Sequence, residues 1–422
     1  MRFLYSLTLL LLMPFALGWL MWRSLRQTGH ADRLGERLGS SPLLSGSPLI
    51  WLHGASVGEI RALAPLVKAV HQRYPQHTLL VTSFSATGRN QAQALFGGRA
   101  LIALLPYDLP FCVNRWLKCV KPTLGIIMET EVWPNLFAAC TRRGVPLLMV
   151  SARLSPRALM RYRRFPRLMR RALQQVAVIA AQSEGDADGF RQLGALPERV
   201  SVGGNLKFDL QFSDNLLSEG QALRASLLPA ATVIVAGSTR ENEEPLVLQA
   251  YQASLAKEPD CVLVLAPRHP ERGAAVAELA KVAGLVARRR SAGRAPLKAG
   301  QVLVLDTLGE LTHFYAAADM AFVGGSLVPL GGHNLLEPAA LGLPVLAGPH
   351  LDNVTDIAEL LRAAGGLIVV ADAPALGQAF IWLTSNPVTR KRVGQAAQQS
   401  VIANRGTLMR ALELVEKQLA RR

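Results

Sequence analysis

Residues 53–59, His-Gly-Ala-Ser-Val-Gly-Glu, directly follow an apolar run at 48–52 and precede a helical pattern. An apolar strand, a turn of small residues and a helix are how α/β proteins build sites at the carboxyl edge of a parallel sheet. The small residues expose backbone N–H groups and allow a substrate to approach closely. Glu59, in the first helical turn, places a carboxylate at this edge, where it can act as a general base. A glutamate that only complements the helix dipole is the structural alternative.

The same segment contains the G-x-S-x-G pattern of serine hydrolases, centred on Ser56. Here the pattern lies on the first strand of the domain, with no earlier strands to build a sheet or supply an oxyanion loop. His269, His313 and His350 are available downstream, but none stands out as the partner of a catalytic triad. A serine hydrolase is therefore the less favoured interpretation.

Composition limits the kind of partner. Half of the 422 residues are hydrophobic, and the formal net charge is +16. The length suffices for two domains with well-buried cores. The charge predicts an anionic partner, and because aromatic residues make up only 6% and no nucleic-acid-binding motif occurs, no nucleic acid is expected. The cysteines lack metal-ligand spacing and are expected to be reduced core residues: Cys112, Cys119, Cys140 and Cys261.

The amino terminus carries an uncharged apolar run at 3–22 that is long enough to cross a bilayer as a helix. An excess of arginine after it places the following domain in the cytoplasm: Arg23, Arg26, Arg33 and Arg37. A cleaved signal peptide is the alternative, but the apolar run continues past the small residues at 16–18. We therefore expect residues 1–22 to form an uncleaved, single-pass anchor in the inner membrane, with the catalytic domain on its cytoplasmic side.

From residue 48 onward, strand patterns alternate with helical patterns through short loops. After 48–52, the first half has expected strands at 78–82, 101–105, 124–128, 146–150 and 176–180. The expected helices between them lie at 57–73, 86–96, 109–120, 133–143 and 156–174. The second half has expected strands at 232–236, 262–265, 284–287, 302–305, 320–323, 344–347 and 366–370. This alternation predicts the α/β class, with two doubly wound, Rossmann-like domains that face each other across a cleft.

The predicted domain boundaries follow from the pause in this alternation. After the anchor at 1–22, a first domain at 23–205 is joined by a linker at 206–230 to a second domain at 231–386. A closing helical segment at 387–422 is long enough to pack back onto the first domain.

The second domain carries the clearest signals for binding phosphate. Gly237, Ser238 and Thr239 end a strand pattern, so their backbone donors and hydroxyls can hold an anion. Further turns at strand ends lie at 267–270, 324–326 and 331–338, and together they can surround one nucleotide. Glu337 is placed to accept hydrogen bonds from ribose hydroxyls. Neither a Walker A motif nor G-x-G-x-x-G occurs, which argues against ATPases and ordinary dehydrogenases.

Two acids of the first domain, Glu129 and Glu131, come directly after a buried strand pattern. Adjacent carboxylates at a strand end are costly unless they meet donors or cations, so one of them is expected to be a site residue. The residues alone do not say which. Lys207 lies at the predicted domain junction, where a solvated surface lysine is the ordinary alternative.

Six motifs in order resemble the 3-deoxy-D-manno-octulosonic acid (Kdo) transferases over nearly the whole chain. They lie at 53–59, 128–135, 205–209, 267–272, 306–311 and 324–338. These enzymes are GT-B glycosyltransferases that move Kdo from CMP-Kdo onto the lipid A precursor of lipopolysaccharide. Leu335 departs from the pattern, because many relatives have proline there.

The resemblance assigns roles to particular residues of this sequence. It implies that Glu59 is the general base and that Glu129 and Lys207 stabilise the transition state. It also implies that the first domain binds the acceptor and the second binds CMP-Kdo. The CMP contacts implied in this way are Pro267, Arg268, Leu308, Gly309, Glu310, Asn334, Leu335, Leu336 and Glu337.

The implied reaction inverts the anomeric carbon and needs no cofactor. A CMP-sugar has one linking phosphate and no diphosphate to chelate, so no metal is expected. The D-x-D pattern at 186–188 is therefore interpreted as the capped start of a helix after Ser183. Seven arginines between 157 and 171 favour contact with an anionic membrane surface over a merely solvated helix face. The alternatives are a GT-B enzyme, including an epimerase, with another nucleotide sugar, or a membrane-anchored serine hydrolase.

Overall fold

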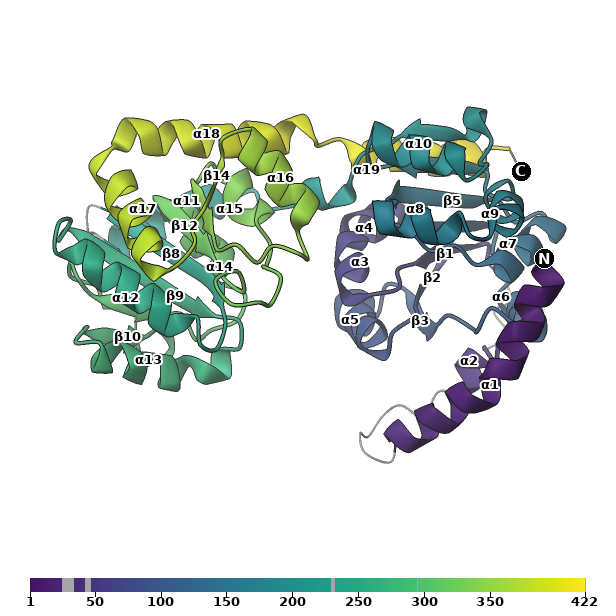
Figure 1. Cartoon of the computed structure of the whole chain (residues 1–422), viewed down its shortest axis with the longest axis horizontal. Helices are drawn as coiled ribbons and strands as arrows, with labels where there is room; N and C mark the ends of the chain where they lie inside the picture. The colour runs from purple at the N-terminus through teal and green to yellow at the C-terminus, as the bar shows by residue number, and fades with distance from the viewer. Residues whose placement is uncertain (25–33, 42–46, 229–231, 294, 422) are drawn as a thin grey trace. The chain divides into compact units, whose positions relative to one another are not determined.

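The computed structural model describes residues 1–24, 34–41, 47–228, 232–293 and 295–421. Arg26, Arg33 and the last two residues of the predicted linker, 229 and 230, lie outside these ranges. The chain divides into two compact units, residues 1–209 with 405–422 and residues 210–404. Each unit is built around its own parallel sheet of seven strands. Figure 1 shows the elements of each unit.

The sheet of the first unit has the order β3-β2-β1-β4-β5-β6-β7. Because the chain runs outward in both directions from the β1–β4 pair, the carboxyl ends of these two strands flank the topological switch point, where α/β sheets bind ligands. The strands are β1 (Leu49–His53), β2 (Thr78–Ser83), β3 (Leu101–Leu104), β4 (Leu124–Met128), β5 (Leu147–Ala152), β6 (Val178–Ala181) and β7 (Val200–Val202).

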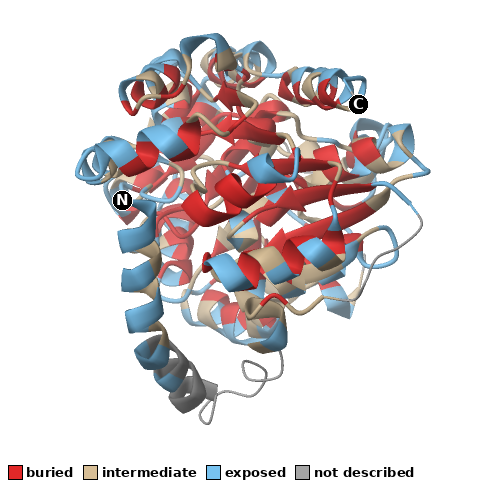
Figure 2. Cartoon of the chain, turned by 90° about the vertical axis from the view of Figure 1, so that its right-hand side faces the viewer, coloured by how far each residue is buried: buried red, intermediate tan, exposed pale blue. Residues whose placement is uncertain are grey.

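Helices cover both faces of this sheet, whose strands are largely buried (Figure 2). Two predicted helices are broken in the structure. The one at 57–73 divides at Leu63, just before Pro65, and the one at 156–174 divides just before Pro166, because proline favours the first turn of a new helix. The helices are α2 (Leu34–Arg37), α3 (Val57–Ala62), α4 (Ala64–Arg73), α5 (Ala86–Phe96), α6 (Pro110–Val120), α7 (Pro134–Arg142), α8 (Pro156–Tyr162), α9 (Pro166–Leu173) and α10 (Glu184–Gln192).

The amino-terminal segment is helical, as α1 (Arg2–Ser24). The prediction that it spans a membrane is not supported: within the described ranges, no helix has both the length and the apolar character needed to cross a bilayer.

The sheet of the second unit has the order β10-β11-β9-β8-β12-β13-β14, with its switch point between β8 and β12. Its strands are β8 (Thr232–Thr239), β9 (Cys261–Pro267), β10 (Ala287–Arg289), β11 (Val302–Val304), β12 (Met320–Val323), β13 (Val345–Ala347) and β14 (Leu367–Val369). Only the strand predicted at 284–287 is substantially displaced, to Ala287–Arg289. The helices are α11 (Leu216–Leu227), α12 (Glu244–Leu255), α13 (Gly273–Val282), α14 (Leu311–Ala316), α15 (Leu336–Ala340), α16 (Thr355–Ala363), α17 (Ala373–Ser385) and α18 (Pro387–Ala403).

The closing segment forms two helices, α18 in the second unit and α19 (Thr407–Leu419) in the first. They are separated at Gly406, whose φ of 90° suits glycine. Asp209 accepts hydrogen bonds from the backbone N–H groups of Gly406 and Leu408, both at 2.7 Å, and so fixes the start of α19. Apolar residues of α19, among them Leu412 and Val415, pack into a core of the first unit.

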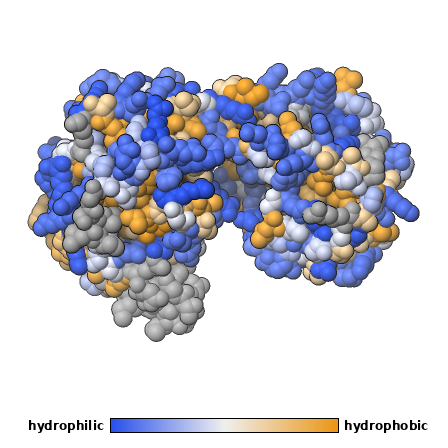
Figure 3. Space-filling view, turned by 180° about the vertical axis from the view of Figure 1, so that it is seen from behind, coloured by the Kyte–Doolittle hydropathy of each residue, from blue (hydrophilic) through white to orange (hydrophobic). Residues whose placement is uncertain are grey.

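The four cysteines are unpaired, as predicted; three are buried and Cys119 is partly exposed. The surface seen in Figure 3 is largely hydrophilic, with hydrophobic patches of limited size.

Candidate functional site

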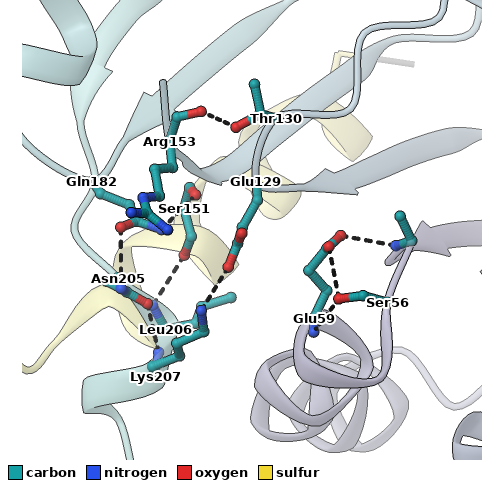
Figure 4. A network of polar contacts seen from close by, with 11 residues as sticks. Ser56, Glu59, Glu129, Thr130, Ser151, Arg153, Gln182, Asn205, Leu206 and Lys207 are labelled. Carbon is teal, nitrogen blue, oxygen red and sulfur yellow. Dashed lines mark hydrogen bonds and ion pairs between the residues drawn. The ribbon is translucent and has the colours of Figure 1, made fainter. Parts of the chain in front are cut away.

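Glu59 begins the first unit's site at the carboxyl end of β1. Ser56 caps α3 by accepting a hydrogen bond from the Glu59 N–H, at 3.3 Å. The Glu59 carboxylate in turn accepts hydrogen bonds from the Ala55 N–H at 2.8 Å and from the Ser56 hydroxyl at 2.9 Å (Figure 4). Burial raises the pKa of Glu59, and these donors oppose the effect. The local hydrogen bonds thus cap the helix and hold the carboxylate in place.

Glu129 and Lys207 form an ion pair beside Glu59. Lys207 Nζ lies 2.8 Å from Glu129 Oε1, and both side chains are largely shielded, with 32% and 16% of their surfaces exposed (Figure 4). Both groups act on the pKa of Glu59, which Glu129 raises and Lys207 lowers. Glu129 directly follows β4 and has a φ of 55°, a left-handed conformation that is uncommon for a residue with a side chain.

A second layer of hydrogen bonds positions Lys207. The short helix Leu206–Phe208 carries it, and the Leu206 N–H donates to Ser151 Oγ at 3.0 Å. Asn205 accepts from the Lys207 N–H at 3.0 Å and donates to Gln182 at 3.1 Å. Lys207 is therefore held by the ends of β5 and β6 and is not a freely solvated lysine.

Glu131, the neighbouring acid, has no comparable cation among the described residues. Burial raises its pKa to about 7, with a further contribution from Glu59 and a smaller one from Glu129. His53 Nε2 lies 4.0 Å from Glu131 Oε2. The Trp133 side chain lowers the pKa of Glu131, although its Nε1–H has no hydrogen-bond partner of normal geometry among the described residues.

A buried hydrogen-bond chain links Trp51 and Thr82 to His53. Trp51 Nε1, which can only donate, lies 2.7 Å from Thr82 Oγ1, and that hydroxyl lies 2.9 Å from His53 Nδ1. The Thr82 hydroxyl can also donate to Leu52 O, at 3.5 Å, so it can either accept from His53 Nδ1 or donate to it, and both tautomers of the neutral ring fit the chain. Burial lowers the pKa of His53 to about 3, so the ring is neutral. The neutral ring lies beside Glu131, and its Nε2 has no hydrogen-bond partner among the described residues.

The structure brings Glu59, Glu129 and Lys207 together within one unit, at the carboxyl ends of β1 and β4 and next to β5 and β6. It also distinguishes the two acids, because Glu129 meets the lysine and Glu131 meets His53. Sequence analysis did not select His53 or Thr82. Their alternation with buried apolar residues along β1 and β2 looks like that of any interior strand.

In the second unit, the phosphate turn predicted at 237–239 is the last part of strand β8, which runs to Thr239 with a shift in its register to β9 between Gly237 and Thr239. Gly237 lies so close to Tyr315 that a Cβ atom there would overlap the tyrosine oxygen, so only glycine fits. Ser238 has a φ of 58°, and the Arg268 N–H donates to Thr239 O at 2.8 Å, which joins this turn to the end of β9. The Gly324 N–H donates to Gly237 O at 2.9 Å, which joins it to the end of β12.

The other predicted nucleotide contacts lie at the same edge of this sheet. Residues 308–310 precede α14, residues 334–337 begin α15, and these two helices pack against each other. Leu308 is 83% exposed, whereas Leu335 and Leu336 are buried, so these two leucines can offer a ligand only their backbone. Asn334 accepts a hydrogen bond from the Leu336 N–H and donates to Glu337, both at 3.0 Å. Arg290 Nη2 lies 2.6 Å from Glu310 Oε1, so Glu310 is held in place by a buried guanidinium.

Glu243 is a site residue that sequence analysis missed. It is fully buried, and its carboxylate accepts hydrogen bonds from the backbone N–H groups of Gly325, Ser326 and Leu327, at 2.7–3.0 Å. It also accepts one from the Arg240 N–H at 3.1 Å. This carboxylate ties the turn after β8 to the turn after β12. Its position in a polar run, 241–244, gives no sign of burial.

Two alternatives from the sequence are resolved as helix caps. Ser56 uses its hydroxyl to cap α3 and bind Glu59, which does not support a role as a hydrolytic nucleophile. Ser183 caps α10 by accepting from the Asp186 N–H, and Asp186 accepts from the Leu154 N–H at 2.7 Å. The capping interpretation of the D-x-D pattern is thus confirmed. No cluster of three or more His, Cys, Asp or Glu side chains suited to a metal occurs in the described ranges.

The basic segment after Arg153 is divided between α8 and α9. The apolar residues of α9, including Leu168 and Met169, face the core and are buried. Met160 and Phe165 are exposed, at 62% and 51%. Any apolar contact of this segment with a membrane would therefore come from α8 and the turn after it.

Comparisons with known proteins identify the family. The family model described as 3-deoxy-D-manno-octulosonic-acid transferase (kdotransferase) matches residues 32–210. The 3-deoxy-D-manno-octulosonic acid transferase of Haemophilus influenzae is 38% identical over 423 residues, covering 100% of this chain and 99% of the relative. That of Bordetella pertussis is 38% identical and covers 98% of this chain and 99% of the relative.

A solved structure supports the two-sheet architecture. UDP-GlcNAc 2-epimerase from Neisseria meningitidis, bound to UDP-GlcNAc, has a TM-score of 0.57 at 14% identity, over 89% of this chain and 100% of that one. This likeness concerns the fold, which is the one expected for GT-B enzymes. The two transferases are similar to this chain over nearly their full length, and the family assignment rests on them. The chain belongs to the 3-deoxy-D-manno-octulosonic acid transferase family and is a glycosyltransferase.

Proposed function

We propose that the enzyme transfers Kdo from CMP-Kdo to a lipid A precursor, with inversion at the anomeric carbon and without a metal. The observation that carries this proposal is the position of Glu59 beside the Glu129–Lys207 pair at the switch point of the first sheet. A carboxylate with a raised pKa is a better general base than an ordinary glutamate, since its conjugate acid is weaker. Glu59 would take the proton of a glucosamine 6-hydroxyl as that oxygen attacks Kdo.

The Glu129–Lys207 pair would stabilise charge in the transition state. Oxygen attack on the anomeric carbon builds positive charge on the Kdo ring while negative charge moves to the departing phosphate. A fixed carboxylate and a fixed ammonium group, 2.8 Å apart, offer both signs of charge without reorganisation. Their shielding from water strengthens this effect.

The second unit would bind CMP at the carboxyl edge of its sheet. The end of β8 at Gly237–Thr239 would offer backbone N–H groups to the phosphate, and Glu337 would offer a carboxylate to the ribose hydroxyls. Glu243 holds two of these turns in register, and Arg290 holds Glu310. CMP-Kdo has a single phosphate and needs no chelated metal. Hydrogen-bond donors of the chain alone would therefore bind it.

We also propose that the enzyme works at the cytoplasmic face of the inner membrane. The proposed acceptor is a lipid, and the net charge of +16 suits an anionic surface. The exposed arginines of α8 and the turn after it, with Met160 and Phe165, form the surface best suited to this contact.

The direct test is incubation of the purified full-length enzyme with CMP-Kdo and a lipid A precursor, followed by mass spectrometry of the lipid. We expect a lipid carrying Kdo, release of CMP, and full activity after EDTA treatment. The variant Glu59→Gln should keep its fold and lower kcat on the order of 100-fold. Glu198→Gln, which alters an exposed glutamate of the same unit, is the matched control.

Three results would overturn the proposal. Glu59→Gln with the activity of the control removes Glu59 from the chemistry. Activity that EDTA abolishes and Mg²⁺ or Mn²⁺ restores argues for a metal site. Transfer from UDP-sugars in place of CMP-Kdo would assign the enzyme a different donor.

A further inference from the structure

An open groove of about 450 Å³ lies between α1 and the helices α6 and α7 of the first unit. On α1 its apolar lining comes from Phe3, Leu7 and Leu10, which are spaced three or four residues apart and so share one face of the helix. The facing wall includes Leu109, Phe111 and Ala139. The groove plays no part in the chemistry at Glu59 described above.

A buried polar network builds this groove by fixing α1 to α7. Asp108 is 3% exposed and accepts hydrogen bonds from the backbone N–H groups of Asn135 and Leu136, at 3.0 and 2.7 Å. The Tyr5 hydroxyl donates to the same carboxylate. The Asn135 amide donates to Ser6 Oγ at 2.9 Å. Polar side chains of α1 therefore contact the capped start of α7, and these contacts fix the position of this wall of the groove.

The groove also carries two positive charges. Arg2 and Arg142 line it. Arg2 opposes the rise that burial causes in the pKa of Asp108, and no salt bridge joins Arg2 or Arg142 to another side chain in the described part of the chain. An apolar channel that carries two guanidinium groups is complementary to an amphiphile with an acyl chain and an anionic group. The volume lies near the lower end of the range for small-molecule pockets, which suits one chain better than a helix with its side chains.

The groove is continuous along the backbone with the proposed acceptor site. The loop that carries Glu129 and Glu131 leads directly into α7, which begins at Pro134 and supplies Asn135, Ala139 and Arg142 to the groove. A lipid whose sugar lies near Glu59 can thus extend its tail along α7. This position favours the reacting lipid over a bystander phospholipid as the occupant.

We propose that the groove holds one fatty acyl chain of the lipid acceptor, with Arg2 and Arg142 facing an anionic group of the same lipid. The inference rests on the proposed function for the identity of the lipid. It adds a substrate subsite that is separate from the reacting groups. It predicts that the enzyme recognises acylation of its acceptor through residues of α1, α6 and α7.

Binding of simple alkyl phosphates tests the groove without any reaction. Octyl, decyl and dodecyl phosphate are titrated below their critical micelle concentrations into the full-length enzyme by calorimetry. Each added methylene should tighten binding about four-fold until the groove is filled. Decyltrimethylammonium should bind at least ten-fold more weakly than decyl phosphate, and inorganic phosphate alone should not bind measurably. Binding that is independent of chain length would overturn the proposal.

Three variants locate the binding. Leu7→Glu and Phe111→Glu alter opposite walls of the groove, whereas Leu4→Glu alters an exposed position of α1 that does not line it. We expect both groove variants to weaken decyl phosphate binding at least ten-fold and Leu4→Glu to behave like the wild type. Circular dichroism and thermal unfolding show whether each variant is folded. Folded groove variants that bind as the wild type does, or an equal loss in Leu4→Glu, contradict the assignment.

Kinetics then distinguish the acceptor from other lipids. For a tetra-acylated acceptor, Leu7→Glu should raise KM at least ten-fold, and for the de-acylated acceptor both KM and kcat should match the wild type. Equal effects on the two acceptors would show that the groove binds a lipid other than the substrate, which overturns the proposal. If the wild type transfers Kdo to neither acceptor, the proposed function fails, while the alkyl phosphate titration still decides whether the groove binds acyl chains.

Discussion

The substitution Glu131→Gln should stabilise the first unit in a pH-dependent way. Burial and the neighbouring Glu59 and Glu129 raise the pKa of Glu131 from 4.5 to about 7. One pKa unit corresponds to about 1.4 kcal/mol, so ionised Glu131 costs the folded unit about 3 kcal/mol. The folded state binds this proton more tightly than the unfolded state. The protonated side chain's contribution to the free energy of unfolding is therefore fully present below pH 4.5 and is lost as the pH rises through 7.

Glutamine keeps the shape of the protonated acid and cannot ionise. The free energy of unfolding of Glu131→Gln should therefore exceed that of the wild type by only about 1 kcal/mol at pH 5 and by about 3 kcal/mol at pH 8. His53, with its pKa of about 3, stays neutral over this range and does not contribute to the difference.

Urea denaturation at pH 5 and pH 8 measures this difference. Trp51 and Trp116 are buried in the first unit, so their fluorescence reports its unfolding. Glu198→Gln, at an exposed position of the same unit, controls for the loss of one negative charge from a basic protein. The reasoning is refuted if the stability difference between Glu131→Gln and the wild type is the same at both pH values.

Three further predictions follow from single contacts. Thr82→Val should lower the free energy of unfolding by about 2 kcal/mol, because it leaves the buried Trp51 N–H without its acceptor; a chemical denaturation midpoint equal to that of the wild type contradicts the chain through His53. Asp186→Ala should lower stability by about 1 kcal/mol while kcat stays unchanged; a large loss of kcat with normal stability would point to a catalytic role. Replacing Arg157, Arg161 and Arg164 with Gln should weaken binding to anionic vesicles, measured by flotation, by about 1 kcal/mol per residue and by less at high salt. Binding that depends on neither salt nor these substitutions would show that this face does not contact the membrane.

The fold was largely predictable because its strands are short apolar runs between turn residues. The strands β4 and β12 begin and end at the predicted residues. The breaks at Leu63 and before Pro166 were missed, since the apolar spacing runs through both positions. β7 was not predicted because three residues, Val200–Val202, are too short a run to stand out as a strand.

The site was predictable only where it depends on position along one strand. Glu59 follows β1 directly, so its place at the sheet edge could be inferred from the sequence. The choice between Glu129 and Glu131 depends on Lys207, which lies 78 residues further along the chain. The role of Glu243 depends on N–H groups more than 80 residues away. Such partners become neighbours only through the order of the strands in the sheet.

The first unit holds its site at a cost in stability. Glu129 and Ser151 adopt left-handed φ values of 55° and 49° at the carboxyl ends of neighbouring strands, each at a cost of about 1–2 kcal/mol. Glycine in place of Ser151 would relieve the backbone strain but would remove the hydroxyl that accepts the Leu206 N–H and so positions Lys207. The raised pKa values of Glu59 and Glu131 oppose stability at neutral pH in the same way. Strain and charge thus gather on the residues around one ion pair, as expected where stability is given up for preorganised chemistry.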